Sequence, residues 1–419
     1  MIIKLSCIIS FLAFSISAAQ NLSWELIASP VDKILRHVQF VNPDTGWAAG
    51  EDGTIIRTND GGYNWEVQST NVQTFIVSLF FLNENLGWAL TAKSATPFGT
   101  TILHTTNGGV DWISEDFPQS STIMNTIFFL DSLNGFVGGK NISKTTDGGQ
   151  SWEITNIDSS IVSGLPVHNF KFYSREFGYA CGGFIDLAGV IWKTSDGGNN
   201  WEATGVSPDQ VFDMYIIDSL NAIALSGDPE GFYGIGLLKT SDAGIRWSFN
   251  ELQLFGLSFS INFRTSLDIW SASGFQFLHS QDGGDSWTVE PTPNGSIVYD
   301  IYFLNSKEGI AVGDSGAILK YITIEDENNS PKNKFLLNQN YPNPFNPSTK
   351  ISWQIYSKSL VSLKIYDVLG KKVSQLINEE ESTGIYSVEF DGEDFPAGIY
   401  FYQLEAGNSS QTKKMVLLK

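Results

Sequence analysis

Short apolar runs and polar turns repeat along residues 23–322, and their order is the same in every repeat. An apolar run leads to a polar turn, then to a run that opens with Gly and often an aromatic residue, and then to a third run. In the first repeat these runs are 38–41, 46–50 and 54–57. Runs of this length between turn residues predict β-strands rather than helices. We therefore expect an all-β fold built from similar units.

A second pattern, which we call the box, follows the third run in six repeats. It reads Thr or Ser, any residue, Asp or Asn, Gly or Ala, Gly, any two residues, and Trp. The box Trp recurs every 40 to 49 residues, the period of a propeller blade. The box predicts a hairpin turn in which the acid or amide caps backbone N–H groups, the second Gly takes positive φ and Trp packs the returning strand. The residues expected in this structural role are Asp60, Gly62, Trp65, Asn107, Gly109, Trp112, Asp147, Gly149, Trp152, Asp196, Gly198, Trp201, Asp242, Gly244, Trp247, Asp282, Gly284 and Trp287.

The last repeat, 301–320, has neither a box nor a strand after it. Residues 23–27, with Trp24, match the strand that follows a box, but nothing similar to a blade precedes them. If the N-terminal segment completes the last sheet, it pairs the final edge and closes the ring. We therefore predict a seven-bladed β-propeller over 20–324, closed by its N-terminal strand.

A different composition begins after the propeller. Residues 325–334 are polar and charged, which predicts a linker. A proline-rich entry segment, 340–347, then leads into alternating strands up to residue 419. This pattern predicts a small antiparallel β-sandwich over 335–419.

The N-terminal residues and the charge limit the possible locations and partners. Lys4, the apolar run 5–16 and the small residues 17–19 predict a signal peptide over 1–19, too short for a stable membrane anchor. No transmembrane segment is expected after its removal, and Cys181 is then the only cysteine, so no internal disulfide can form. The net charge of -20 disfavours nucleic-acid binding, which requires cations for the phosphates.

Both regions resemble known families. The boxes resemble the Asp-box (BNR repeat) of bacterial neuraminidase-type propellers, and residues 23–322 as a whole resemble the photosystem II assembly and stability factor family. This resemblance implies the fold but not an activity, because Asp-boxes occur in hydrolases and in non-enzymes.

The tail closely resembles the type A C-terminal sorting domain of the type IX secretion system (T9SS) of Bacteroidota and their relatives. This implies export by that machinery to the exterior or the outer-membrane surface. A carbohydrate-binding Ig-like domain is the alternative for the tail. By resemblance, the sorting motif comprises Tyr341, Pro342, Asn343, Pro344, Phe345, Asn346, Pro347, Gly370, Gly398, Tyr400 and Lys413.

Three enlarged loops, 92–100, 183–189 and 227–236, are expected on the propeller face opposite the boxes. Long loops on a rigid scaffold commonly carry binding sites. They and a nearby strand entry supply candidate ligand-binding residues, and the loops supply candidate catalytic acids, although solvated loop residues are the simpler interpretation. The ligand-binding candidates are Lys93, Phe98, His168, Phe184, Phe232 and Tyr233, and the acids are Asp186, Asp228 and Glu230.

The sequence gives little support for sialidase activity or for a metal site. The mature chain has five arginines and lacks the N-terminal arginine motif of sialidases. His37, His104, His168 and His279 do not have the spacing of metal ligands, so neither a metal nor a cofactor is expected. We favour a non-catalytic module that binds a protein or a glycan. The alternatives are a glycoside hydrolase with loop carboxylates and, third, a factor for assembling a pigment–protein complex.

The residue before each box forms a further series. It is basic or an imidazole in all six cases, and the seventh repeat has a counterpart. We interpret it as a local pair with the box acid three residues on, for example Arg57 with Asp60. The alternative is a cationic belt for an acidic polymer or partner. The series is Arg57, His104, Lys144, Lys193, Lys239, His279 and Lys320.

Overall fold

The computed structural model describes residues 22–93, 98–118, 122–227, 234–323, 335–340, 342–355, 358–368, 370–382, 384–406 and 409–419. The chain divides into two compact units, Leu22–Thr323 and a second unit that holds the described residues from Phe335 onward. The described residues are strands joined by turns and by the short 3-10 helices η1 (Glu51–Gly53), η2 (Pro293–Gly295) and η3 (Asp314–Gly316). Among these residues, no helix is long and apolar enough to cross a membrane.

The described part of the first unit forms seven antiparallel sheets, which we number 1 to 7 in chain order. Sheet 4 has a fifth, parallel strand, β14 (Asn156–Ile157), beside β18. The strands of the sheets are β2 (Leu35–Phe40), β3 (Gly46–Gly50), β4 (Ile55–Thr58) and β5 (Glu66–Gln68) in sheet 1; β6 (Ile76–Phe81), β7 (Gly87–Lys93), β8 (Gly99–Thr105) and β9 (Ile113–Asp116) in sheet 2; β10 (Met124–Phe129), β11 (Gly135–Gly139), β12 (Ile142–Thr145) and β13 (Glu153–Ile154) in sheet 3; β15 (Val167–Phe172), β16 (Gly178–Phe184), β17 (Ala188–Thr194) and β18 (Asn200–Ser207) in sheet 4; β19 (Val211–Ile216), β20 (Ala222–Ser226), β21 (Gly236–Thr240) and β22 (Ser248–Glu251) in sheet 5; β23 (Ser260–Phe263), β24 (Ile269–Ser273), β25 (Gln276–Ser280) and β26 (Thr288–Pro291) in sheet 6; and β27 (Val298–Phe303), β28 (Gly309–Gly313), β29 (Ile318–Thr323) and β1 (Leu22–Ile27) in sheet 7.

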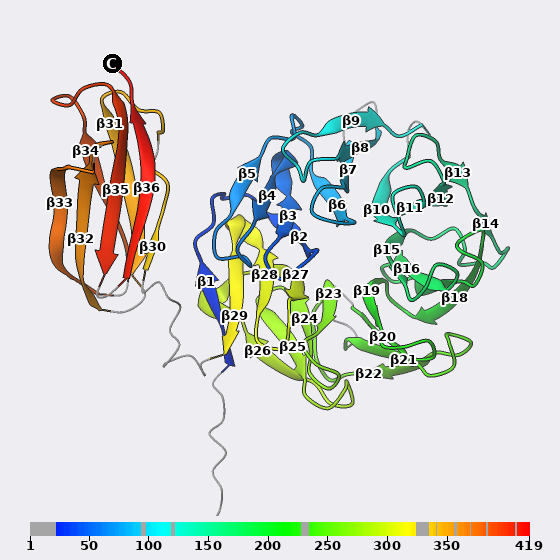
Figure 1. Ribbon diagram of the computed structural model, residues 1–419. Helices are drawn as coiled ribbons and strands as arrows, with labels where there is room; N and C mark the ends of the chain where they lie inside the picture. Colours follow the sequence, from blue (N-terminus) through cyan, green and yellow to red (C-terminus); the bar gives the residue numbers. More distant parts are fainter. Residues whose placement is uncertain are drawn as a thin grey trace, which may run out of the picture. The chain divides into compact units, whose positions relative to one another are not determined.

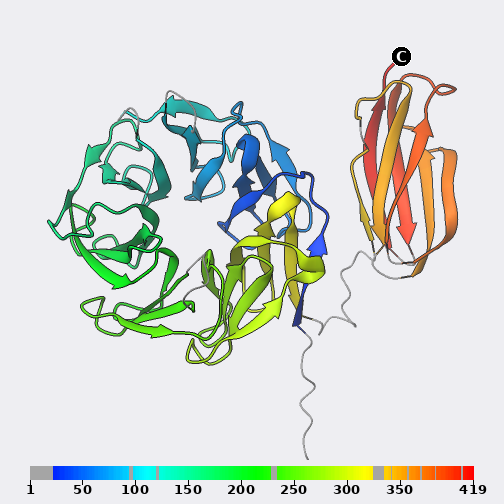
Figure 2. The same ribbon diagram turned by 180° about the vertical axis from the view of Figure 1, so that it is seen from behind.

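The sheets stand around a common axis like the blades of a propeller (Figures 1 and 2). The first strand of each sheet is innermost: β2 contacts β6, and the contacts continue through β10, β15, β19, β23 and β27 back to β2. On these inner strands, fully buried residues such as Leu35, Val38 and Phe40 of β2 are separated by half-buried ones. The axis is therefore lined by one strand from each sheet.

The N-terminal strand joins the last sheet, as the sequence predicted. β1 pairs antiparallel with β29, with Trp24 opposite Tyr321 and Ile27 opposite Ile318. The Trp24 indole is buried and stacks on Phe277 of sheet 6 at 4.8 Å between ring centroids. The first and last parts of this unit are thus tied together by a ladder and by an aromatic cluster.

The glycine that opens the second strand of most sheets has a packing reason. A Cβ on Gly87 would lie 2.4 Å from the ring of Phe81, on the neighbouring strand. The next residue, as Trp47 shows in sheet 1, is fully buried and stacks on Phe81 of the following sheet at 3.5 Å between centroids. Glycine lets the phenyl ring lie flat over the backbone, and the aromatic residue fills the gap between sheets.

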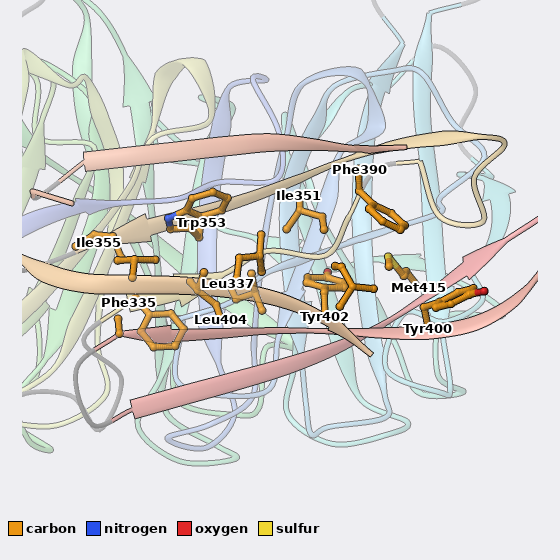
Figure 3. Packing of buried hydrophobic residues seen from close by; sticks show 14 of the residues in the cluster. Phe335, Leu337, Ile351, Trp353, Ile355, Phe390, Tyr400, Tyr402, Leu404 and Met415 are labelled. Atoms are coloured by element: carbon orange, nitrogen blue, oxygen red, sulfur yellow. The ribbon is translucent and has the colours of Figure 1, made fainter. Parts of the chain in front are cut away.

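The second unit consists of two sheets around one core. Three strands form one sheet and four form the other, and residues from both pack in a single cluster (Figure 3). The cluster includes Trp353 and Ile351 of the first sheet and Tyr402 and Met415 of the second. The strands are β30 (Phe335–Leu337), β31 (Ser348–Ile355) and β34 (Gly384–Asp391), and β33 (Lys372–Glu381), β32 (Ser359–Tyr366), β35 (Gly398–Ala406) and β36 (Ser409–Leu417).

Candidate functional site

The boxes form closed hydrogen-bond networks. In the first, Thr58 Oγ1 donates to Asp60 Oδ1 and accepts from Gly62 N, while Asp60 Oδ1 also accepts from Asn64 N at 2.8 Å. The indole of Trp65 donates to Gly62 O at 3.0 Å. In the sixth box the hydrogen bonds of the Ser286 side chain and backbone lower the pKa of Asp282 far below its ordinary value. Since these acids are occupied within their own turn, they hold the turn together and are not free for a ligand.

The basic series before the boxes does not pair with its own box, so that interpretation was wrong. Lys144 Nζ of sheet 3 donates to Gly197 O, in the box of sheet 4, at 2.8 Å. Lys239 Nζ of sheet 5 bonds to Asp285 in the box of sheet 6 at 2.7 Å. Lys320 Nζ of sheet 7 donates to Gly61 O in the box of sheet 1 at 2.7 Å. These three cations therefore link one sheet to the next.

The rest of the series is also engaged with protein groups. The Arg57 guanidinium lies over the Trp47 ring, and His104 stacks on Trp88. Lys193 pairs with Glu202 of its own sheet at 3.8 Å. With these partners, the series is mainly a set of structural contacts and does not form a free cationic belt.

His279 belongs to a buried charge cluster between sheets 6 and 7. Its Nδ1 lies 2.6 Å from Glu290 Oε1, and its ring stacks on Trp270 at 3.8 Å. Burial lowers the pKa of His279, but hydrogen bonds to Asp268 and Glu290 raise it more, to about 8. The imidazolium is therefore retained at neutral pH. Asp268 in turn accepts from Arg264 at 2.6 Å, so the charges of this cluster are paired within the protein.

The candidates in the long loops are only partly placed. Asp228, Glu230, Phe232 and Tyr233 lie outside the described residues. Asp186 is exposed, and its backbone N donates to Asp209 Oδ1 at 2.9 Å. A carboxylate pair for hydrolysis is therefore not defined by the described residues.

Two of the other loop candidates are exposed aromatic residues. Phe184 is 56% exposed and Phe98 is 51% exposed. Lys93 forms an ion pair with Asp116, so its charge is already balanced. The described loops thus offer apolar surface rather than reactive groups.

His168 lies on the inner strand β15 and is half-buried. Its ring stacks on Phe212 of the next sheet at 5.5 Å between centroids. Burial lowers the pKa of His168, while Gln210 and the Gly183 backbone act against that shift. The imidazole is thus neutral at pH 7 and acts as a flat ring rather than as a cation.

His168 is one end of a larger feature that we call the axial arc: His168, Phe212, Phe259, Tyr299 and Arg36. They lie on or directly beside the inner strands of sheets 4, 5, 6, 7 and 1. Phe212 lies 5.7 Å from Phe259, and Phe259 lies 5.2 Å from Tyr299 between ring centroids. The Arg36 guanidinium is 4.0 Å from the Tyr299 ring centroid. Each side chain is half-buried, and together they form a row of four rings and one cation on or beside the inner strands of five successive sheets.

On four inner strands, a polar side chain links neighbouring sheets. Three of these residues directly follow a member of the arc in the sequence. Asp300 Oδ2 accepts from Val38 N at 2.9 Å, which joins sheet 7 to sheet 1. Ser260 Oγ accepts from Ile301 N at 3.1 Å, which joins sheet 6 to sheet 7. Two further links of the same form run from Ser78 to Ile127 N and from Asp213 to Ile261 N. We call these four contacts the axial belt.

Ionisable side chains lie within the axial belt and beside it. Lys171 Nζ lies 2.9 Å from Asp213 Oδ1, which also accepts from Asn169 Nδ2 at 2.8 Å. Burial alone would lower the pKa of Lys171, but the Asp213 charge and hydrogen bond raise it above its ordinary value. Burial raises the pKa of Asp300 to about 7, and the nearby Asp213 charge adds to this effect. Burial also lowers the pKa of His37 to about 4.

Sequence reasoning found only His168 of these axial residues. Lys171 lies inside the apolar run 170–173, and Asp213 and Asp300 directly precede the runs 214–217 and 301–304. Asp213 and Asp300 hold the same register position in their repeats, and this was the available signal for these two residues. Among the described residues, no three His, Cys, Asp or Glu side chains are grouped so that they could hold a metal ion.

Two family models match the chain. Residues 339–418 match the secretion system C-terminal sorting domain. Residues 16–117 match photosynthesis system II assembly factor YCF48. The chain resembles such an assembly factor and ends in a sorting domain. That domain indicates secretion by the type IX system to the cell surface or the extracellular space.

Similar proteins support the resemblance to the assembly factor. The chloroplastic photosystem II stability/assembly factor HCF136 of Arabidopsis thaliana is 24% identical over 71% of this chain and 79% of that protein. The solved structure of YCF48 bound to D1 peptide is 22% identical, covers 72% of this chain and 97% of that one, and has a TM-score of 0.57. The GH74 xyloglucanase from Xanthomonas campestris has a TM-score of 0.55 at 12% identity, over 80% of this chain and 59% of that one. At these identities the solved structures establish the propeller fold alone.

The sorting motif holds the final strand of the second unit. Asn343 Oδ1 accepts from Val416 N at 2.8 Å, and Phe345 N donates to Val416 O at 2.9 Å. The Phe345 ring is buried in the core, and Tyr400 Oη donates to Pro396 O. Tyr341 lies outside the described residues. In this unit the conspicuous motif residues fasten the entry segment to the C-terminal strand.

Proposed function

We propose that the chain is a secreted, non-catalytic binding module. Its 20–324 region is a seven-bladed propeller closed by the N-terminal strand, and its 335–419 region is a β-sandwich that engages the secretion machinery. The described boxes, the basic series and the axial belt all serve the scaffold through contacts within the protein. This leaves the axis end with the arc, together with the exposed Phe98 and Phe184 of the long loops, as the surface for a partner.

The observation that carries the proposal is the axial arc. Four rings in successive contact present flat faces, and Arg36 adds a positive charge next to them. Half-buried aromatic residues with one fixed polar group are typical of binding sites. The solved YCF48 structure holds a peptide, which supports a binding role for this fold. Assembly of a photosystem is disfavoured, because the sorting domain directs this chain outside the cell.

A glycan array and a peptide array test for binding, and a reducing-sugar assay on polysaccharides tests for hydrolysis. We expect binding without release of reducing sugar. Replacing Phe259 by Leu should abolish the binding, because it removes a ring from the middle of the arc. The control is Val67→Ala, on the outer strand β5, where Val67 is 58% exposed. Equal losses in the two variants, or no effect of Phe259→Leu, would count against the arc as the site.

A glycoside hydrolase is the second candidate function. It is favoured by the exposed Asp186 in a long loop and by the fold that the chain shares with a GH74 xyloglucanase. Release of reducing sugar from a polysaccharide, lost in Asp186→Asn or Asp228→Asn but kept in Asp60→Asn, would establish hydrolysis and contradict the non-catalytic proposal.

A further inference from the structure

Arg36, like Arg57, lies over an aromatic ring and differs from the other three arginines in its charged partners. Arg175, Arg246 and Arg264 each bond to an aspartate. In the described part of the chain, no carboxylate lies within ion-pair distance of Arg36, although the chain has 45 acidic residues. Arginine stays charged at any physiological pH, so this half-buried cation is left available for an external anion.

The geometry of Arg36 suits a carboxylate with a ring beside it. Its guanidinium carbon lies 4.0 Å from the Tyr299 ring centroid and 5.6 Å from that of Phe259. Stacking of this kind occupies a face of the guanidinium and leaves its N–H edge free to form two parallel bonds to a carboxylate. The remaining rings of the arc continue the apolar surface away from the charge.

The axial belt argues against a peptide that adds a strand. The N–H groups of Val38, Ile127, Ile261 and Ile301 on the inner strands already donate to side chains of neighbouring sheets. An extended peptide that pairs with a sheet edge relies on such free donors. Recognition at the arc must therefore come from stacking and charge, which a sugar ring with an acidic group can provide.

We propose that the axial arc binds a uronic acid residue of an acidic glycan. The Arg36 guanidinium takes the sugar carboxylate, and Tyr299 and Phe259 stack against the apolar face of the sugar ring. The inference rests on the proposed binding function and names its ligand. Because the chain is acidic overall, the affinity depends on this local contact and not on long-range attraction.

Calorimetric titration of the secreted protein tests this assignment. The probes are a trigalacturonate, its methyl ester, and a short peptide with an aromatic C-terminal residue and a free carboxylate. The variants are Arg36→Gln and, as a control, Arg175→Gln, whose native side chain pairs with Asp131 and is 70% exposed. We expect Arg36→Gln to weaken trigalacturonate binding about 10- to 100-fold. Arg175→Gln should leave binding unchanged, and thermal melts should show both variants folded.

The outcomes separate the two proposals. If the neutral ester binds as tightly as the acid, the carboxylate assignment is overturned while a binding function stands. If the peptide binds through Arg36 and the glycan does not, the ligand is a peptide terminus and the glycan assignment is overturned. If binding of every probe survives Arg36→Gln, and binding in the array test survives Phe259→Leu, the arc is not the site, and both proposals fail at this location.

Discussion

At the residue scale, the same kinds of side chain have different roles according to their neighbours. Asp282 is held ionised by the hydrogen bonds of its own turn, whereas burial raises the pKa of Asp300 to about 7. Lys320 is buried and bonds to a backbone carbonyl of sheet 1, while the Arg36 guanidinium lies over the Tyr299 ring. Charge in this protein is therefore mostly used to fix turns and to join sheets, and only a few groups remain for a ligand.

Asp300 gives a residue-scale prediction about pH. Its folded pKa of about 7 exceeds the usual value of an unfolded Asp, so the folded state binds more protons between about pH 4 and 7. Its contribution therefore makes stability fall as pH rises through that window. Asp300→Asn keeps an acceptor for Val38 N and should remove this component, on the order of 2 kcal/mol in the free energy of unfolding.

Urea unfolding at pH 5 and pH 8 measures the effect. The groups near Asp300 are Lys171, Asp213 and the backbone donors of Val38 and Ile301. We expect the variant to gain stability relative to the native chain at pH 8 and to gain little at pH 5. A gain that is the same at both pH values would refute the titration of Asp300 in this window.

At the element scale, the Gly-aromatic opening of the second strand is a packing device that recurs around the ring. Glycine makes room for a phenyl ring of the first strand, and the aromatic residue packs on the following sheet, as Trp88 does on Phe129 at 3.6 Å. The box of the following sheet also contacts this aromatic residue, since the Trp47 indole donates to Gly108 O of the second box. Sequence repeats therefore encode contacts between sheets as much as the sheets themselves.

Gly87→Ala tests this device. The added Cβ would lie 2.4 Å from the Phe81 ring, so the ring or the strand must shift. Overpacking of this kind should lower the free energy of unfolding by about 1–3 kcal/mol. Gly164→Ala is the matched control, because nothing lies within 4 Å of its Cβ position. Chemical denaturation that finds both variants equally stable would show that the close approach is not a constraint.

At the scale of the whole molecule, the ring is closed in several independent ways. β1 pairs with β29, Lys320 bonds to Gly61 O, and Asp300 accepts from Val38 N. Each contact joins residues that are far apart in the chain. Cooperative stability of the first unit should therefore depend on the seam in sheet 7.

Trp24→Ala tests the seam. The indole is buried at 7% exposure and packs against rings of sheets 6 and 7, so its loss should cost about 3–5 kcal/mol. Leu26→Ala, on the same strand at 41% exposure, should cost far less. Thermal melts of the two variants provide the comparison. Similar melting temperatures for both would contradict the role of Trp24 in closing the ring.

The sequence by itself determined the repeating strands, the box turns, the pairing of the Trp24 segment with the last sheet and the sorting domain. Local turn chemistry and apolar periodicity are short-range properties, so they can be recognised from the sequence alone. The partners of Lys144 and Lys239 were predicted wrongly because the residues they contact belong to the next sheet. The axial arc was missed for a related reason. Its five members are spread over the chain from Arg36 to Tyr299, and only the curvature of the ring brings them to one axis.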